Sequence, residues 1–154
     1  MPKFESTRRV SHSAQDMFAL VADVESYPEF ISLCESLTIR QRRARDGQEV
    51  LVADMTVGYK SIRETFTSQV QLTPSENRIR ATYLDGPFKH LDNRWHFIDR
   101  EDGTSDVHFY IEYEFKSRVL GALMGAMFDR AFRKFSADFE ARADAIYKTA
   151  ATPG

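Results

Sequence analysis

The sequence contains very little cysteine and no surplus of charge of either sign. Cys34 is the single cysteine among 154 residues, so an intrachain disulfide cannot form and a Cys-x-x-Cys zinc or redox site is excluded. The 21 Lys and Arg residues stand against 23 Asp and Glu residues, a formal net charge of -2. This balance argues against a protein that binds polyanions through a uniformly basic surface, but it allows a local basic patch.

Long hydrophobic runs and flexible linkers are also missing. No uninterrupted apolar run approaches the ~18 residues of a transmembrane helix, and residues 1–10 lack the apolar centre of a secretory signal. We therefore expect a cytoplasmic protein, either free or held peripherally at the inner membrane. Without repeats or Pro/Gly-rich segments, the chain is expected to form a single domain over residues 1–148, followed by a flexible tail over 149–154.

Motifs of enzymes and metalloproteins are absent too. The sequence has no Gly-x-Ser-x-Gly nucleophile elbow, no glycine-rich phosphate loop and no dinucleotide fingerprint. The four histidines show no His-x-x-x-His spacing that would suit a metal ion. We therefore expect no catalytic residue, no metal and no catalytic cofactor.

Aromatic residues, by contrast, are abundant: 12 Phe, 6 Tyr and 1 Trp in a chain of this length. Many lie in segments where apolar and polar residues alternate, the pattern of strands with one buried face. The final such segment is the clearest, because Val107, Phe109, Ile111, Tyr113 and Phe115 share one face. Short turn signals between the segments imply an antiparallel meander. The predicted strands are Lys3 to Val10, Leu37 to Arg43, Glu49 to Val57, Ile62 to Leu72, Arg78 to Leu84, Leu91 to Asp99 and Val107 to Phe115.

Three helices are predicted around these strands. Ser11 or Ser13 can cap a first helix through Val21. Pro28 suits the first turn of a second, short helix that carries Phe30, Ile31 and Leu33. From Arg118 to Lys148, apolar residues recur every three or four positions, which predicts a helix about 45 Å long. Such a helix can bury its apolar stripe only against the apolar face of the sheet.

This order of elements resembles the helix-grip fold of the START-like superfamily, an α+β class in which a curved antiparallel sheet of about seven strands grips a long C-terminal helix. Two short helices lie between the first and second strands. The resemblance is sharpest over residues 24–30 (Val-Glu-Ser-Tyr-Pro-Glu-Phe) and 113–128, from Tyr-Glu-Phe-Lys-Ser to Leu-Gly-Ala-Leu-Met-Gly-Ala-Met-Phe. Both stretches are similar to the coenzyme Q-binding protein family, which also includes bacterial ribosome association toxins.

The resemblance implies that the protein binds a polyprenylated quinone such as ubiquinone, as a lipid carrier or chaperone that supports respiratory electron transport. It implies no catalytic turnover. Two alternatives stay open: a toxin-like protein that binds the large ribosomal subunit, and an enzyme similar to the polyketide cyclases of the superfamily. DNA is not an expected partner.

An apolar cavity between sheet and helix is the expected ligand site, because a long apolar ligand needs a concave apolar pocket with few polar groups. Ordinary core packing is the alternative for each candidate residue. The candidates are Met55, Phe66, Tyr83, Trp95, Phe97, Phe109, Ile111 and Tyr113 from the strands, and Met124, Met127, Phe128 and Ala131 from the helix.

Gly121 and Gly125 lie beside these helical candidates, and each weakens a helix by ~1 kcal/mol relative to Ala. Close approach of another segment, mobility at a gate, or a fraying first turn would each explain them.

Two further groups of residues are candidates for contact with partners. Tyr27, Pro28 and Phe30 are placed where a lid or a membrane-touching surface is expected, and a hydrophobic staple that fixes the helix pair is the alternative. A basic cluster precedes the Asp46-Gly47 turn and suits either a solvated hairpin tip or a contact with anionic lipid headgroups or ribosomal RNA. It consists of Arg40, Arg42, Arg43 and Arg45.

Overall fold

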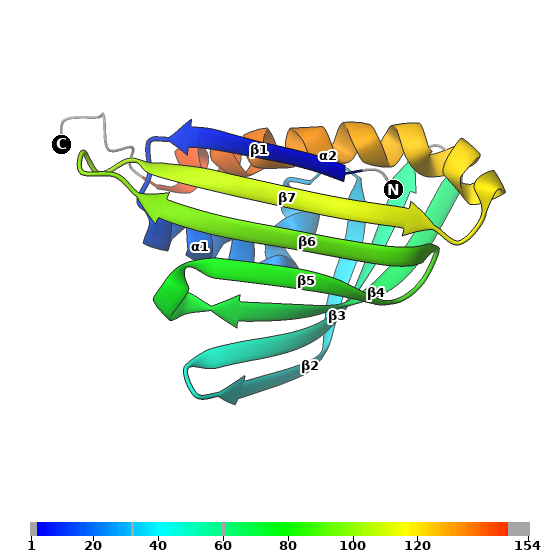
Figure 1. The fold of residues 1–154 in the computed structure, drawn as a ribbon, viewed down its shortest axis with the longest axis horizontal. Coiled ribbons are helices and arrows are strands. Elements are labelled where there is room, and N and C mark those ends of the chain that lie inside the picture. The colour runs from blue at the N-terminus through cyan, green and yellow to red at the C-terminus, as the bar shows by residue number, and fades with distance from the viewer. Residues whose placement is uncertain (1–2, 32, 60, 148–154) are drawn as a thin grey trace.

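A seven-stranded antiparallel sheet wraps around a long C-terminal helix in the computed structural model, which describes residues 3–31, 33–59 and 61–147 (Figure 1). The strand order is β1-β7-β6-β5-β4-β3-β2, so β2 to β7 form a meander and β1 pairs with its last strand. The strands are β1 (Lys3–Val10), β2 (Cys34–Arg45), β3 (Gln48–Tyr59), β4 (Ile62–Thr73), β5 (Arg78–Asp85), β6 (Phe88–Asp99) and β7 (Ser105–Phe115).

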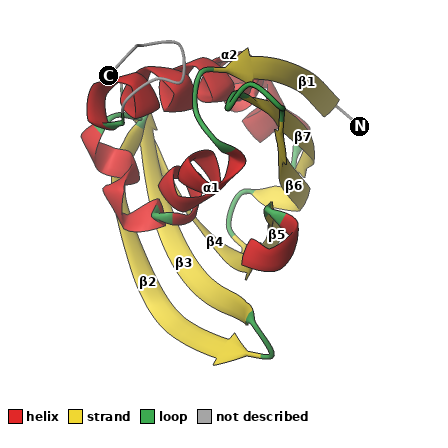
Figure 2. Ribbon diagram, turned by 90° about the vertical axis from the view of Figure 1, so that its left-hand side faces the viewer, coloured by secondary structure: helices red, strands yellow, loops and turns green. Residues whose placement is uncertain are grey.

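The predicted α+β helix-grip architecture is therefore confirmed. The sheet bends strongly, so that β2 to β4 and β5 to β7 enclose the helices between them (Figure 2). The end of the predicted C-terminal helix at Lys148 and the tail over 149–154 lie outside the described residues.

The first helix, α1 (Ala14–Ala22), is capped by Ser13, one of the two serines predicted for this role. The Ser13 hydroxyl accepts a hydrogen bond from the Asp16 N–H at 3.1 Å, which satisfies one of the free donors of the first turn. The apolar side of α1 faces the core, with Met17 and Val21 fully buried.

The second short helix differs from the prediction. It is a 3-10 helix, η1 (Val24–Glu29), with Pro28 near its end, and Phe30, Ile31 and Leu33 follow it. The turns begin directly after α1, because the Ser26 N–H donates to the Asp23 carbonyl at 3.1 Å and Val24 is buried against the core. The segment expected to interrupt the helices is therefore itself helical.

The long helix α2 (Arg118–Ile146) covers the inner face of the sheet. Its Ser117 hydroxyl accepts from the Leu120 N–H at 3.1 Å and caps the first turn. Aromatic rings join helix to sheet: Phe139 meets Trp95 with ring centroids 5.2 Å apart, and Phe132 meets Tyr113 at 5.1 Å. These edge-to-face contacts, with the apolar area they bury, fix the position of α2.

One turn needs its glycine. Gly86, between β5 and β6, has φ +138, and a Cβ there would lie 2.7 Å from the Cβ of Phe66. A larger residue would therefore push against β4 as well as strain the backbone.

No helix among the described residues is long and apolar enough to cross a membrane.

Candidate ligand-binding cavity

A cavity of about 110 Å³ lies between the curved sheet, η1 and α2. Aliphatic and aromatic side chains from β2 to β7 make its walls, and Phe128, Phe132, Phe135 and Phe139 of α2 close one side. The described lining residues include no Asp, Glu, His, Lys or Arg. The space therefore suits an apolar molecule with few polar atoms.

The structure brings six of the twelve predicted cavity residues to this space. These are Met55, Phe66, Trp95, Ile111, Phe128 and Ala131. Met127 instead lines a neighbouring groove between α2 and Ile62 of β4.

The other five predicted residues pack in the core around the cavity. Phe97 is covered by Phe18 of α1, whose ring lies 6.2 Å away in a T-shaped contact. Tyr113 is covered by Phe132, and the Tyr83 hydroxyl accepts a hydrogen bond from the Phe88 N–H at 3.2 Å. The five are Tyr83, Phe97, Phe109, Tyr113 and Met124.

Small residues on the inner face were missed by the sequence analysis, although the alternating pattern places them there. Ala53 of β3 and Ala81 of β5 line the cavity and leave room that larger side chains would fill. A short side chain between bulky neighbours is the signal that could have located the space. The remaining lining residues that were not predicted for the cavity are Val24, Tyr27, Ile31, Leu33, Cys34, Leu37, Val57, Ser68, Val70, Ile79, Leu91, Asn93, Phe132, Phe135 and Phe139.

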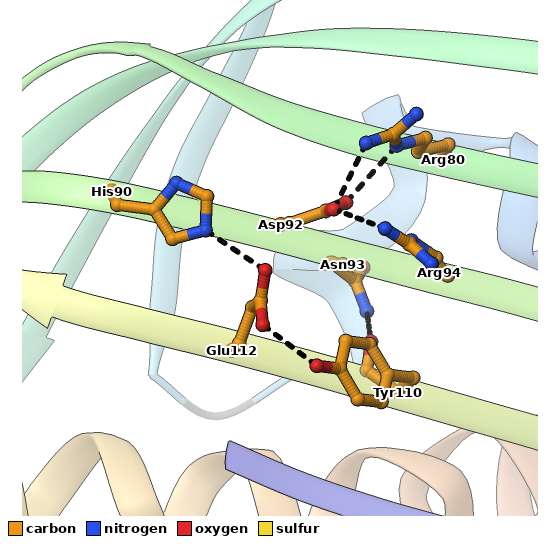
Figure 3. Close-up of polar contacts among 7 residues, drawn as sticks. All are labelled: Arg80, His90, Asp92, Asn93, Arg94, Tyr110 and Glu112. Atoms are coloured by element: carbon orange, nitrogen blue, oxygen red, sulfur yellow. Dashed lines mark hydrogen bonds and ion pairs between the residues drawn. The ribbon is translucent and has the colours of Figure 1, made fainter. Parts of the chain in front are cut away.

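Two polar side chains face the cavity on either side of Ala81. Ala81 pairs with Asn93 of β6 on one side and with Val70 of β4 on the other, and Ser68 is the next inward residue of β4. The Asn93 amide donates to the Tyr110 carbonyl at 3.0 Å (Figure 3), and its oxygen accepts from Trp95 Nε1 at 3.0 Å. The Ser68 hydroxyl, in a residue only 8% exposed, has no hydrogen bond within the described chain. It can therefore donate to a ligand.

Cys34 contributes a thiol to the same wall. Burial raises the pKa of this thiol to about 11, so the group stays protonated at neutral pH. Because the thiolate is the reactive form, Cys34 acts here as a small apolar residue.

A groove of about 440 Å³, which we call the outer groove, lies next to the cavity, between one flank of α2 and the residues Ile31, Leu33 and Ile62. Leu123, Ala126 and Arg130 line it from the helix. Groove and cavity share a wall, to which Ile31, Leu33, Ala131 and Phe135 contribute. Displacement of these shared side chains would join the cavity to the groove.

The predicted lid residues lie next to this shared wall, directly before Ile31 in the chain. Tyr27 and Phe30 pack against Phe139 of α2, with ring centroids 5.2 Å and 5.3 Å away. The Tyr27 hydroxyl donates to the Val21 carbonyl, and burial raises its pKa. Pro28 lies between them in η1 and is half-buried. Arg142 of α2 also forms an ion pair with Glu29 of η1 at 3.1 Å. The contacts of this segment therefore hold η1 against α2.

The two glycines of α2 are not needed for close packing. A Cβ at Gly125 would meet no atom within 4 Å, and one at Gly121 would meet Phe115 at 3.8 Å, an ordinary contact. Close approach is therefore excluded as their reason. Gly125 lies in the second turn, beyond a fraying first turn, which favours mobility of this end of the helix.

The predicted basic cluster lies exposed along β2 and its hairpin, and carboxylates accompany most of it. Arg40 lies 3.6 Å from Asp54, and Arg42 pairs with Glu49. Arg45 lies 3.7 Å from Asp46. Arg43 is the one member with no carboxylate contact within the described residues.

A second polar network lies on the outer face of the sheet, away from the cavity (Figure 3). Asp92 accepts hydrogen bonds from Arg80 on β5 and from Arg94 on its own strand. Burial by itself raises the pKa of Asp92, but the two guanidinium groups outweigh burial and lower it overall. Glu112 joins β7 to His90 of β6 at 3.0 Å. These contacts tie the strands behind the cavity together.

Comparison with known proteins agrees with this geometry. Residues 10–140 match the model of the family described as polyketide cyclase / dehydrase and lipid transport. The chain belongs to this family.

Two curated relatives bear different names. The chain is 34% identical over 148 residues to the ribosome association toxin RatA of Vibrio cholerae, covering 96% of this chain and 99% of that protein. It is 28% identical over 149 residues to the mitochondrial coenzyme Q-binding protein COQ10 homolog B of Xenopus laevis, covering 94% of this chain and 59% of that protein.

Solved structures show the same fold. An 18 kDa protein from Caulobacter crescentus is 33% identical, with a TM-score of 0.77 over 95% of this chain and 98% of that one. A START superfamily protein from Mycobacterium smegmatis is 20% identical, with a TM-score of 0.77 over 94% of this chain and 99% of that one. The START-like assignment made from the sequence is therefore confirmed.

We expect the Cys34 thiol to react slowly with a disulfide reagent such as DTNB at pH 8. A pKa of about 11 in place of the ordinary 9.0 lowers the thiolate fraction at this pH about 100-fold. The same raised pKa stabilises the fold below about pH 9, and this contribution is lost as the pH rises through 11. The measurement compares folded protein with protein in urea, and equal rates would contradict the burial of this thiol.

Replacing Gly125→Ala should raise the free energy of unfolding by about 0.5–1 kcal/mol, because the new methyl group meets no atom and alanine favours the helix. Urea denaturation measures this change. Ala126→Gly, at the exposed neighbouring position, is the matched variant and should lower stability by a similar amount. An unchanged or lowered stability of Gly125→Ala would show that this position requires glycine.

Proposed function

We propose that this protein binds a polyprenylated quinone such as ubiquinone in the cavity between the sheet and α2. It acts as a carrier or chaperone of this lipid at the inner membrane and so supports respiratory electron transport. The observation that carries the proposal is the apolar cavity at whose wall the Ser68 hydroxyl has no hydrogen bond within the described chain. The coenzyme Q-binding name of a relative that matches 94% of this chain supports the same ligand class.

The polar groups of the cavity suit the head of such a lipid. A quinone ring carries carbonyl and methoxy oxygens, which accept hydrogen bonds and donate none. The Ser68 hydroxyl can donate to one of them, while Trp95 and Phe66 offer aromatic surfaces to the ring. We therefore place the ring beside Ala81, between Ser68 and Asn93.

The size of the cavity requires it to open. A space of about 110 Å³ is smaller than the roughly 150 Å³ apolar cavity that holds benzene in an engineered protein. The tail must then pass through the wall shared with the outer groove, where Leu33 and Ala131 lie. Each buried CH₂ contributes about 0.8 kcal/mol, so a tail of a few isoprene units compensates for the rearrangement and supplies micromolar binding.

Binding rather than catalysis fits the lining. The carboxylate or imidazole that usually serves as general acid or base is missing from the described lining residues. Because the family description also names cyclases, an enzyme is the alternative. Such an enzyme would need a carboxylate or imidazole to enter the cavity when α2 moves.

Titration with ubiquinone bearing two isoprene units should quench the fluorescence of Trp95, with a dissociation constant in the micromolar range. Trp95 is the single tryptophan of the chain and lies in the cavity wall, and quinones quench excited indole by accepting an electron. Ala81→Leu adds three carbon atoms to the cavity and should weaken binding at least tenfold.

Two further variants sharpen this titration. Ala141→Leu makes the same change at an exposed position of α2 and should leave binding unaltered. Ser68→Ala removes the hydroxyl and should weaken binding about fivefold, the worth of one hydrogen bond. Unquenched fluorescence of the folded wild-type protein, or equal affinity of the Ala81→Leu variant, would refute the site.

Ribosome association is the second candidate. The toxin named for it matches this chain over 99% of its own length, whereas the chain spans about three fifths of the coenzyme Q-binding relative. Arg43 has no carboxylate contact within the described residues, and Arg42 next to it on β2 pairs with Glu49 at the surface; both offer cations for phosphate groups.

If this second function holds, the protein should sediment with ribosomes at low salt, and the double variant Arg42→Glu/Arg43→Glu should remain in the supernatant. Arg78→Glu, a similarly exposed charge reversal on β5, serves as the control. Absence of wild-type protein from the ribosome pellet would remove this candidate.

A further inference from the structure

We propose that the first half of α2 docks on a membrane surface rich in anionic phospholipid, with Val119 and Leu123 entering the interface. Lys116, Arg118 and Arg130 contact the phosphate headgroups around them. We name these five residues the docking surface. Membrane docking through this surface would help to deliver any apolar ligand to the cavity, so the proposal does not depend on the ligand being a quinone.

The apolar part of the docking surface is unusually exposed. Val119 is 68% and Leu123 61% exposed, the highest values among the large hydrophobic residues of the described chain that are exposed. They lie four positions apart and so form one stripe on the helix. Ala122 and Ala126 are exposed beside them. A continuous aliphatic stripe in water marks an interaction surface rather than scattered surface residues.

The cations of the docking surface lack carboxylate partners. Within the described residues, no ion pair or hydrogen bond engages the side chain of Lys116, Arg118 or Arg130. Farther along the same helix the pattern changes, since Arg133 pairs with Asp129 at 3.0 Å and Lys134 lies 3.9 Å from Asp138. The positive charge beside the stripe is therefore available to an external anion.

The helix itself disfavours this arrangement unless an anion is present. The N-terminal end of a helix carries a partial positive charge, which favours acidic residues in the first turn. The first turn of α2 has none and begins with Arg118, with Lys116 two positions earlier. A phosphate group near this end would relieve the repulsion among these charges.

The position of the docking surface connects it with the cavity. Leu123 and Arg130 also line the outer groove that shares a wall with the cavity. The first turns of α2 extend along the margin of the molecule, past the beginning of β1 (Figure 1). Contact with lipid would thus bring the mouth of the groove to the bilayer, and Gly121 and Gly125 weaken the same turns.

Lipid fits this surface better than RNA does. Proteins recognise RNA by stacking on aromatic rings, by polar groups that reach base edges, and by contacts with phosphates and 2′-hydroxyls, and none of these uses exposed aliphatic side chains. The stripe offers aliphatic side chains alone, which gain free energy by entering the acyl boundary of a bilayer.

Flotation with quinone-free vesicles tests the proposal. Vesicles of phosphatidylcholine with 30% phosphatidylglycerol should carry the wild-type protein, and vesicles of phosphatidylcholine alone should carry at least tenfold less. The variant Val119→Ser/Leu123→Ser should bind the anionic vesicles at least tenfold more weakly. Lys116→Gln/Arg118→Gln should lose about 25-fold in binding, since each basic residue near such a surface contributes about fivefold.

Two control variants test whether the loss of binding is specific to the docking surface. Ile146→Ser removes an exposed aliphatic residue at the other end of α2, and Arg45→Gln removes an exposed cation on β2. Both should float like the wild type.

Three results would overturn the proposal. One is wild-type protein that floats with neither vesicle, and another is equal flotation of the docking-surface variants. The third is a change from dimer to monomer in Val119→Ser/Leu123→Ser by light scattering, which would assign the stripe to a second copy of the chain. The vesicles contain no quinone, so a failed quinone titration leaves this test intact.

Discussion

Burial of the inner face of the sheet against α2 is the constraint on which the rest of the structure depends. The sheet presents Trp95, Phe109 and Tyr113 on one face, and no other element of the described chain is long enough to cover that face. Phe132 and Phe139 of α2 meet these rings edge to face. Because the sheet must curl to follow the helix, small residues such as Ala81 leave space at the centre of the curve.

The two halves of α2 are held very differently. The C-terminal half is fixed by ion pairs from Arg8 to Glu140 and from Glu29 to Arg142, and by His12, which contacts Asp144 at 2.7 Å. In the N-terminal half, Met124 and Phe128 are buried against the core, but the first two turns carry the glycines, exposed aliphatic side chains and cations that have no carboxylate partner in the described chain. A helix anchored at one end can move its other end without unfolding the core. Ligand exchange at the groove and contact with lipid would use the same weakly held turns.

Membership of the family leaves the activity open, because a fold carries many functions on different sites. The relatives named for coenzyme Q and for ribosomes both match nearly the whole of this chain. Binding of coenzyme Q would use the cavity, whereas a ribosome contact would use the outer surface, where Arg43 lies. The two activities can therefore be separated by variants.

The sequence by itself determined the strands, the first helix with a serine cap and the long amphipathic helix, because alternation and helical periodicity are local properties of the chain. It also indicated the inner face, since a period of two assigns each residue to one side. Only the tertiary structure decided which inward residues reach the cavity. Phe97 and Trp95 share a face, yet α1 covers Phe97 and Trp95 reaches the cavity. Likewise, the pairing of Arg42 with Glu49 across a hairpin depends on strand register. How deeply a side chain is buried and which residue it contacts depend on elements distant in sequence, and no local pattern encodes these contacts.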